Sequence, residues 1–206
     1  YWRRDVADAD FITPSENFYG YQPTFETDIQ DHMNVLGLTF MTRTGWNADA
    51  SVTYGKNSVS YTVNNSVNRN YLSDNGTSPR TFYPGGYNLS NVISNLDFSK
   101  VFDDKISASL GVEYKKEYFE AVEGDPLSYY GSGSDSFAGI KPSEAGEWNR
   151  NNFAAYLGID FDISDDLLLS FAGRYEDFSD FGDNFSWKAA GRYKLGESGV
   201  LRASHS

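Results

Sequence analysis

Few residues in this chain have a type and spacing that would support catalysis. The two histidines, His32 and His205, lie far apart and have no partner at the spacing of a general base or a zinc site. The acidic run Asp160–Asp166 lacks the central Gly and terminal Glu of a calcium loop. Gly131–Ser134 is not followed by a helix pattern that would bind phosphate. In the acidic cluster Glu176–Asp183, a weak cation contact is the alternative to solvated side chains. We therefore predict no enzyme activity, no metal site and no cofactor.

Aromatic side chains in two segments rich in Gly, Ser and Asn are better candidates for ligand contact. The segments are residues 64–88 and 123–147. Tyrosine offers a rigid, amphipathic surface that suits a catecholate, a haem, a peptide or the face of a sugar. The alternative is that these side chains pack loop against loop. The candidate ligand-binding residues are Tyr71, Phe82, Tyr83, Tyr87, Tyr129 and Tyr130, with Phe137 in the second segment.

The elements that hold these segments are β-strands, because apolar and polar residues alternate along them. The clearest runs lie between Phe153 and Leu195, where apolar residues occupy every second position. We expect about eight strands and essentially no helix. Earlier strands are predicted at 34–42, 46–63, 89–102 and 105–122, and a last one at 200–206. In the strand at 46–63 the apolar phase slips at Gly55–Ser58, which predicts a β-bulge.

The connections between the strands alternate in length. Turns of two or three residues follow four of the predicted strands, and the long polar segments 64–88 and 123–147 lie between them. Transmembrane β-barrels have short periplasmic turns and longer outer loops. Several predicted strands also exceed the common soluble length of about 5–6 residues. These two signals favour a barrel over a soluble β-sandwich, whose strands alternate equally well.

If the strands form a barrel, their polar face points to the lumen. The lumen-facing wall charges are then Glu113, Arg174, Glu176, Lys188 and Arg192. The two arginines are expected to pair with the two glutamates, with singly solvated charges as the alternative. Aromatic girdles are expected at the two membrane interfaces, formed by Trp46 and Phe102 at one and by Tyr114, Tyr118, Tyr175 and Phe178 at the other.

Composition limits the class of partner. The net charge is −12, which argues against nucleic acid because phosphate neutralisation needs clustered Lys and Arg. The absence of cysteine excludes disulfides and thiolate chemistry. No run approaches the roughly 20 apolar residues of a membrane helix, whereas barrel strands need only about ten alternating residues each.

Several separated motifs resemble the barrel domain of TonB-dependent outer-membrane receptors. LLSFAGRYEDFSDFGD at 168–183 is followed by WKAAGRY at 187–193 and by LRAS at 201–204. Upstream, NLDFSKV at 95–101 and SLGVEYKKEYFEAVEGDPLSY at 109–129 resemble the same family. So do YGKNSVSYTVNNSVN at 54–68 and NRNNFAAY at 149–156. The similarity covers residues 31–206 in the family's order.

The resemblance implies an all-β fold, an antiparallel up-and-down transmembrane β-barrel of which this chain holds only about eight strands. Residues 1–206 are then part of one barrel domain, with 1–30 as an extracellular loop and with no plug domain or barrel closure. The implied function is TonB-driven uptake, across the outer membrane of a Gram-negative bacterium, of a scarce large nutrient such as an iron–siderophore complex. The implied partners are outer-membrane lipid, the receptor's own plug domain, the TonB complex and a nutrient ligand. The alternative is a soluble β-sandwich module for binding or adhesion, with carbohydrate as one class of ligand.

Overall fold

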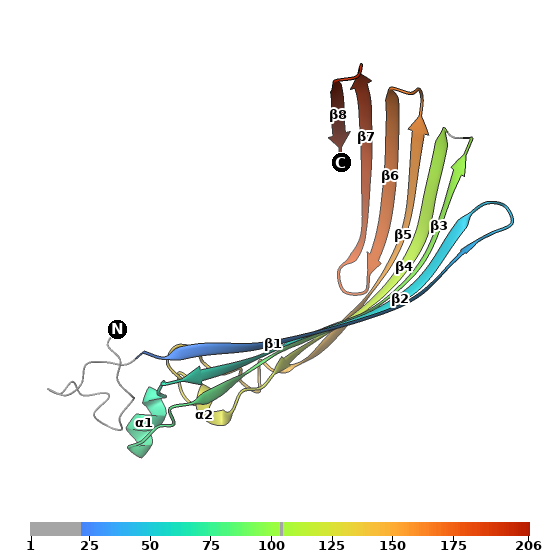
Figure 1. Ribbon diagram of the computed structural model, residues 1–206. Helices are drawn as coiled ribbons and strands as arrows, with labels where there is room; N and C mark the ends of the chain where they lie inside the picture. Colours follow the sequence, from blue (N-terminus) through green and yellow to red (C-terminus); the bar gives the residue numbers. More distant parts are fainter. Residues whose placement is uncertain (1–21, 104) are drawn as a thin grey trace. The chain divides into compact units, whose positions relative to one another are not determined.

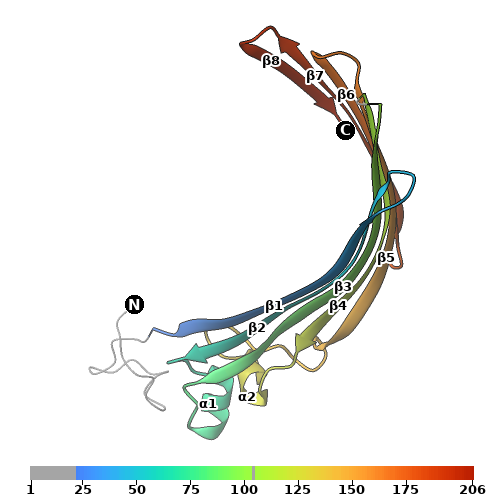
Figure 2. The same ribbon diagram turned by 45° about the vertical axis from the view of Figure 1, so that its right-hand side comes forward.

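The sheet follows the order of the chain from its first strand to its last. The computed structural model describes residues 22–103 and 105–206, and its strands form one eight-stranded sheet in the order β1 to β8. The strand bounds are β1 (Thr24–Met41), β2 (Asn47–Asn64), β3 (Phe82–Phe102), β4 (Ile106–Val122), β5 (Gly146–Asp162), β6 (Leu167–Phe178), β7 (Gly182–Leu195) and β8 (Gly199–His205). Figures 1 and 2 show each strand beside the next one along the chain. This up-and-down antiparallel sheet confirms the predicted fold class, and the described strands form no second layer of the kind that a sandwich requires.

Register along the last strands confirms the predicted division into two faces. Tyr156 of β5 lies opposite Arg174 of β6, which lies opposite Ser186 of β7. The intervening positions are apolar and exposed, with Leu157, Phe171 and Trp187 among them. An exposed apolar face of this extent needs a non-aqueous neighbour, which the acyl chains of a bilayer provide.

Three strands begin earlier than the alternation predicted. β1 starts at Thr24, so residues 24–30 belong to a strand and not to a loop, while residues 1–21 lie outside the described residues. β3 starts at Phe82 and β5 at Gly146. The added residues are mostly a mixture of polar residues, aromatic residues and glycines, without an aliphatic residue at every second position. A strand that continues beyond the apolar band needs no apolar face, so its sequence loses the period-two signal.

The expectation of essentially no helix was wrong in the loops. α1 (Arg69–Asn75) lies between β2 and β3, and α2 (Pro126–Tyr129) lies between β4 and β5. The sequence does carry the end signals of α1: the Asn68 side chain caps its N-terminus, and Gly76 follows its C-terminus with φ of 74°. Neither described helix is long and apolar enough to cross a membrane.

The predicted bulge in β2 is not needed to explain its change of phase. Odd-numbered positions make side-chain contacts on one face both before and after the slip: Asp49 accepts a hydrogen bond from Thr39, and Asn57 donates one to Asp31. Tyr61 then stacks on Phe25. The alternation therefore continues, and what changes at residues 55–58 is which face is apolar.

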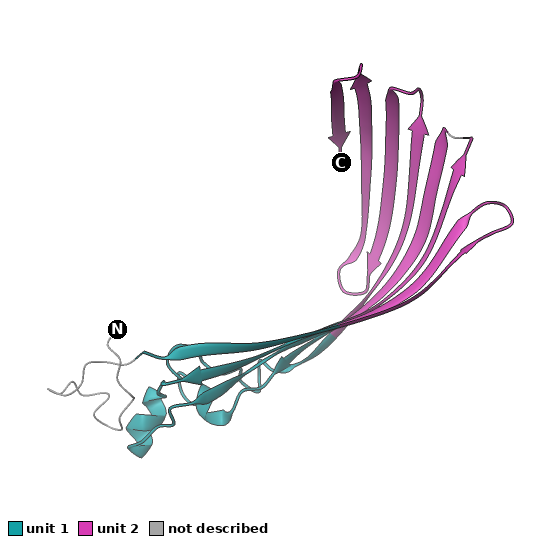
Figure 3. Ribbon diagram, viewed as in Figure 1, with its two compact units in different colours: residues 1–32, 56–90, 118–148 teal, residues 33–55, 91–117, 149–206 magenta. Residues whose placement is uncertain are grey.

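The chain divides into two compact units, shown in different colours in Figure 3. Unit 1 comprises residues 1–32, 56–90 and 118–148, and unit 2 comprises residues 33–55, 91–117 and 149–206. Unit 1 holds both helices and both long loops. Its buried apolar side chains come mostly from the loops and the adjoining strand ends: Val63, Val67, Leu72, Phe82 and Ile140. The long loops thus have a packed core of their own.

Candidate ligand surface and charged wall

Two buried side chains, those of Asn68 and Ser66, join the two long loops of unit 1, and the Ser66 hydroxyl donates to the carbonyl oxygen of Asp135 at 2.5 Å. Asn68 makes three side-chain hydrogen bonds. Its Oδ1 accepts a hydrogen bond from the backbone N–H of Tyr71, which caps α1. Its Nδ2 donates to the carbonyl oxygens of Leu127 at 2.9 Å and Tyr130 at 2.8 Å in the other loop. Because Asn68 is fully buried, each of these bonds replaces solvent that the groups have lost.

Surface contacts reinforce this junction. Arg69 forms an ion pair with Asp135 at 2.8 Å, and the Ser132 hydroxyl donates to the side chain of Asn70 at 2.6 Å. The hydroxyl of Tyr130 donates to Asp74 at 2.8 Å. We infer that the loops 65–81 and 123–145 move together, because their contacts link one to the other.

The predicted ligand-binding residues fall into different environments. Tyr71 and Tyr130 pack edge to face with ring centroids 5.4 Å apart, and Phe82 is fully buried in the loop core. These three side chains make the loop-against-loop contacts that were given as the alternative to ligand contact. Tyr83 is exposed, and the Tyr129 hydroxyl donates to Glu123 at 2.7 Å. Tyr87 belongs to a larger aromatic group.

That group is a row of five aromatic side chains, one from each of the strands β1 to β5. We call it the aromatic row; it consists of Phe25, Tyr61, Tyr87, Phe119 and Trp148. Successive ring centroids lie 5.1 Å apart for Phe25–Tyr61, 6.2 Å for Tyr61–Tyr87, 5.8 Å for Tyr87–Phe119 and 5.8 Å for Phe119–Trp148. Phe137 of the loop 123–145 packs against Phe25 at 4.9 Å and Tyr61 at 5.4 Å.

The aromatic row does not lie on the face that carries the Glu26–Asn64 and Asn88–Glu120 pairs. The neighbouring positions pair on the other face of the same strands, Glu26 with Asn64 and Asn88 with Glu120. The row instead shares its face with Asp31 and Asn57. Sequence reasoning missed it because the five residues are scattered over 124 positions of chain. The available signal was the change in apolar alternation within β2. It places Tyr61 on the face that is polar in the first half of that strand.

We expect Tyr129 and Tyr130 to ionise independently of each other, each at a pH above the usual tyrosine pKa. Hydrogen bonds to Asp74 and Glu123 raise the pKa of Tyr130 and of Tyr129 above the usual value, and the nearby charges add to the effect. The contribution of these two hydrogen bonds to folding stability is therefore complete below the ordinary tyrosine pKa. It is lost as pH rises through the raised pKa. Asp74→Asn should lower the pKa of Tyr130 alone, and Glu123→Gln that of Tyr129 alone. Tyrosine-selective carbon NMR of the receptor measures both, and a common shift in either variant would contradict the assignment.

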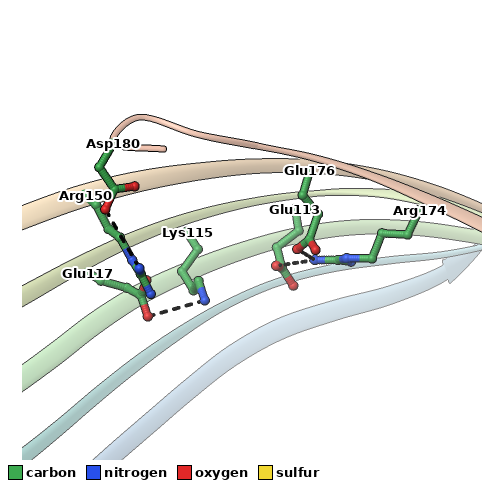
Figure 4. Close-up of polar contacts among 7 residues, drawn as sticks. All are labelled: Glu113, Lys115, Glu117, Arg150, Arg174, Glu176 and Asp180. Carbon is green, nitrogen blue, oxygen red and sulfur yellow. Dashed lines mark hydrogen bonds and ion pairs between the residues drawn. The ribbon is translucent and has the colours of Figure 1, made fainter. Parts of the chain in front are cut away.

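The charged wall of unit 2 contains two groups of ion pairs (Figure 4). In the first, Arg174 of β6 contacts Glu113 of β4 at 2.9 Å and Glu176 on its own strand at 3.0 Å. This is the pairing expected for those three residues. In the second, Glu117 accepts from Arg150 at 2.5 Å and lies 3.3 Å from Lys115. Asp180 lies 3.9 Å from Arg150.

Replacing Arg174 by Gln should destabilise the wall because it leaves Glu113 and Glu176 without their common cation. The three side chains are partly exposed, so we expect about 1–2 kcal/mol and not the larger penalty of a fully buried pair. The measurement is urea unfolding of the full receptor in lipid vesicles. Lys188→Gln, which removes a positive charge from the neighbouring strand, serves as the control. Equal losses in the two variants would show that the ion pairs contribute nothing specific.

A tyrosine bridges β5 and β3 across β4 in the same wall. The hydroxyl of Tyr156 hydrogen-bonds to Asp97, and the Arg174 guanidinium lies 6.0 Å from the Tyr156 ring centroid. Gly111 of β4 leaves the room for this crossing, because a Cβ there would lie 2.6 Å from the Tyr156 ring. Aromatic side chains cover strand glycines in this way in curved sheets.

The other two predicted wall residues do not join these groups. Arg192 lies opposite Arg202 in the β7–β8 register, and its Nε is buried with no hydrogen-bond partner in the described part of the chain. Lys188 lies opposite Ala172 of β6. By alternation both side chains share the face of Arg174. Phe178, expected in a girdle, packs under the Arg150 guanidinium at 5.6 Å and so lies on the charged face. Trp46 and Phe102 do pair at the short-turn end, at 5.7 Å.

No group of three or more His, Cys, Asp or Glu side chains within residues 22–103 and 105–206 is arranged to hold a metal ion. The acidic residues of unit 2 that make contacts are paired with cations or hydroxyls. The arrangement is therefore one of paired charges and aromatic surface.

An open antiparallel sheet, apolar on one face and charged on the other, with long loops at one end, defines a segment of transmembrane barrel wall. The chain matches the family model described as TonB dependent receptor-like, beta-barrel, over residues 1–206. It therefore belongs to the TonB-dependent receptors, which are outer-membrane proteins that work with a plug domain and TonB and whose activity is transport. A search of curated proteins found no match.

Proposed function

We propose that this chain forms wall and loops of a receptor that imports a large, scarce nutrient across the outer membrane. An iron–siderophore complex is one nutrient of this kind. The observation that supports the proposal most directly is the union of the two long loops around Asn68, beside the exposed aromatic row of the same unit. Loops that share a core can present a fixed surface to a ligand, which reduces the ordering cost of binding.

The orientation follows from loop length. The short turns 42–46 and 163–166 face the periplasm, and the loops 65–81 and 123–145 face the outside of a Gram-negative cell. The proposed ligand-contacting residues are Tyr83 and Tyr87 together with the rest of the aromatic row, and Tyr71, Tyr129 and Tyr130 position the loops. Phe82 acts as a core residue.

The test is growth of a strain that lacks the full receptor gene on defined sources of iron, cobalamin and glycan. We expect a defect on one source, restored by the wild-type gene in cells that have TonB and not in cells without it. Growth equal to wild type on every source would contradict nutrient import by this receptor. Restoration without TonB would contradict the proposed energy source.

A further inference from the structure

The aromatic row gives unit 1 an elongated aromatic strip on the strand face that also carries Asp31 and Asn57. Neighbouring strands lie about 4.8 Å apart, so five side chains on five consecutive strands extend over roughly 20 Å. Both ends of the strip and the fourth of its five rings are open: Phe25 is 45% exposed, Trp148 52% and Phe119 40%. A compact ligand would cover only part of such a strip, whereas a linear chain of rings would follow its length.

Hydrogen-bonding groups accompany the rings. Within the described residues, the hydroxyls of Tyr61 and Tyr87 carry no hydrogen bond, and both side chains are half-buried in the row. Asp31 and Asn57, 2.7 Å apart, lie on the same face of β1 and β2. Phenol, carboxylate and amide groups beside an aromatic surface are complementary to a ligand with an apolar ring face and many hydroxyls at its edge.

The charge around the strip disfavours an anionic ligand. Acidic residues outnumber basic ones in residues 22–32, 56–90 and 118–148. Along β5 the cation Arg150 follows Trp148 by two positions. It is already paired with Glu117 and Asp180. Arg69 is paired with Asp135. A multiply charged anion, such as a ferric tris-catecholate, would have to displace these carboxylates.

We propose that the aromatic row binds an uncharged, linear oligosaccharide, whose ring faces stack along the strip while its hydroxyls bond to Tyr61, Tyr87, Asp31 and Asn57. The proposal rests on the function proposed above and specifies its ligand class. Phe137 contributes from the loop 123–145 by its contacts with Phe25 and Tyr61. Loop position and ligand contact are thus linked at that end of the strip.

The test measures binding to the purified full-length receptor by calorimetry and tryptophan fluorescence. The probes are maltoheptaose, laminariheptaose, cellohexaose and xylohexaose as neutral chains, glucose as the single ring, and a ferric tris-catecholate as the anion. We expect at least one of the chains to bind, glucose to bind much more weakly, and the anion not to compete.

The variants are Phe119→Leu and Trp148→Leu, which keep an apolar side chain and remove the aromatic face. Each should weaken binding of the chain about tenfold, equivalent to about 1.4 kcal/mol. Phe181→Leu alters an exposed aromatic residue of the β6–β7 turn and should leave the affinity unchanged. Heat-modifiable migration in gels confirms that each variant is folded.

Three results would overturn the proposal: no binding of any chain in the panel, binding that is insensitive to both row variants, or binding of the ferric complex that depends on the row. The last result would leave the proposed import function intact and change only its ligand class. A receptor without TonB-dependent uptake of any nutrient would instead contradict the proposed function itself.

Discussion

Asn68→Ala is expected to loosen the contact between the two long loops of unit 1. The change removes the cap of α1, which is worth about 1 kcal/mol. It also leaves the carbonyl oxygen of Leu127 without its donor, and a buried unsatisfied group costs about 1–3 kcal/mol. The carbonyl oxygen of Tyr130 loses its bond to Asn68 and keeps the one from the N–H of Gly133 at 3.0 Å. A local loss of about 3 kcal/mol follows. It should appear as faster amide hydrogen exchange in residues 123–145 and as new cleavage there in limited proteolysis of the full receptor.

Two companion variants separate these contributions. Asn68→Asp keeps the acceptor for the Tyr71 N–H and turns a carboxylate oxygen toward the two carbonyls, so it should be at least as damaging as alanine. Asn70→Ala removes an exposed side chain that also bonds to the second loop, through Ser132, and should cost less than 1 kcal/mol. If Asn68→Asp retains the wild-type exchange rates, capping of α1 is the whole role of Asn68.

Gly85→Ala is expected to break the packing where β3 meets the end of β4. Gly85 has φ of 97°, and a Cβ there would lie 2.2 Å from the carbonyl oxygen of Val122 and 3.0 Å from the N–H of Gly124. Both contacts are with backbone, so no side chain can rotate away. Overpacking of about 1–3 kcal/mol adds to about 1 kcal/mol for the left-handed conformation. We expect a loss of about 3 kcal/mol in urea unfolding of the receptor in vesicles.

Gly182→Ala isolates the conformational part of this effect. Gly182 has a similar φ of 92°, and a Cβ there would meet nothing within 4 Å. It should therefore cost only about 1 kcal/mol. Equal losses at the two positions would mean that β3 and β4 shift to admit a side chain at Gly85, and that the close approach there is not a constraint.

Much of the strand framework was predictable because a strand buried or lipid-covered on one face must alternate. That rule located the eight strands and the faces of Arg174, Glu176 and Glu113. It failed where strands continue past the apolar band, as at Thr24, because mixed polar residues carry no period. In β2 a change in which face is apolar produces the same sequence pattern as a bulge.

Less could be predicted from the sequence for the loop residues than for the strands. The sequence marked Tyr71 and Tyr130 as candidates for ligand contact, and the ends of α1 were readable from Asn68 and Gly76. No local pattern could indicate that Tyr71 packs on Tyr130, or that Phe82 is buried while Tyr83 beside it is exposed. Those outcomes depend on which loop lies against which.

The sequence by itself therefore determined the class of this protein: an alternating antiparallel wall with unequal connections and the motifs of a TonB-dependent receptor. These properties are local, since each strand's pattern reports the medium on its two sides. Only the tertiary structure decided the surface offered to a ligand. Asn68 meets its partners 59 and 62 positions further along the chain, and the aromatic row takes one residue from each of five strands. Such contacts arise from sheet register and loop packing, which no short segment encodes.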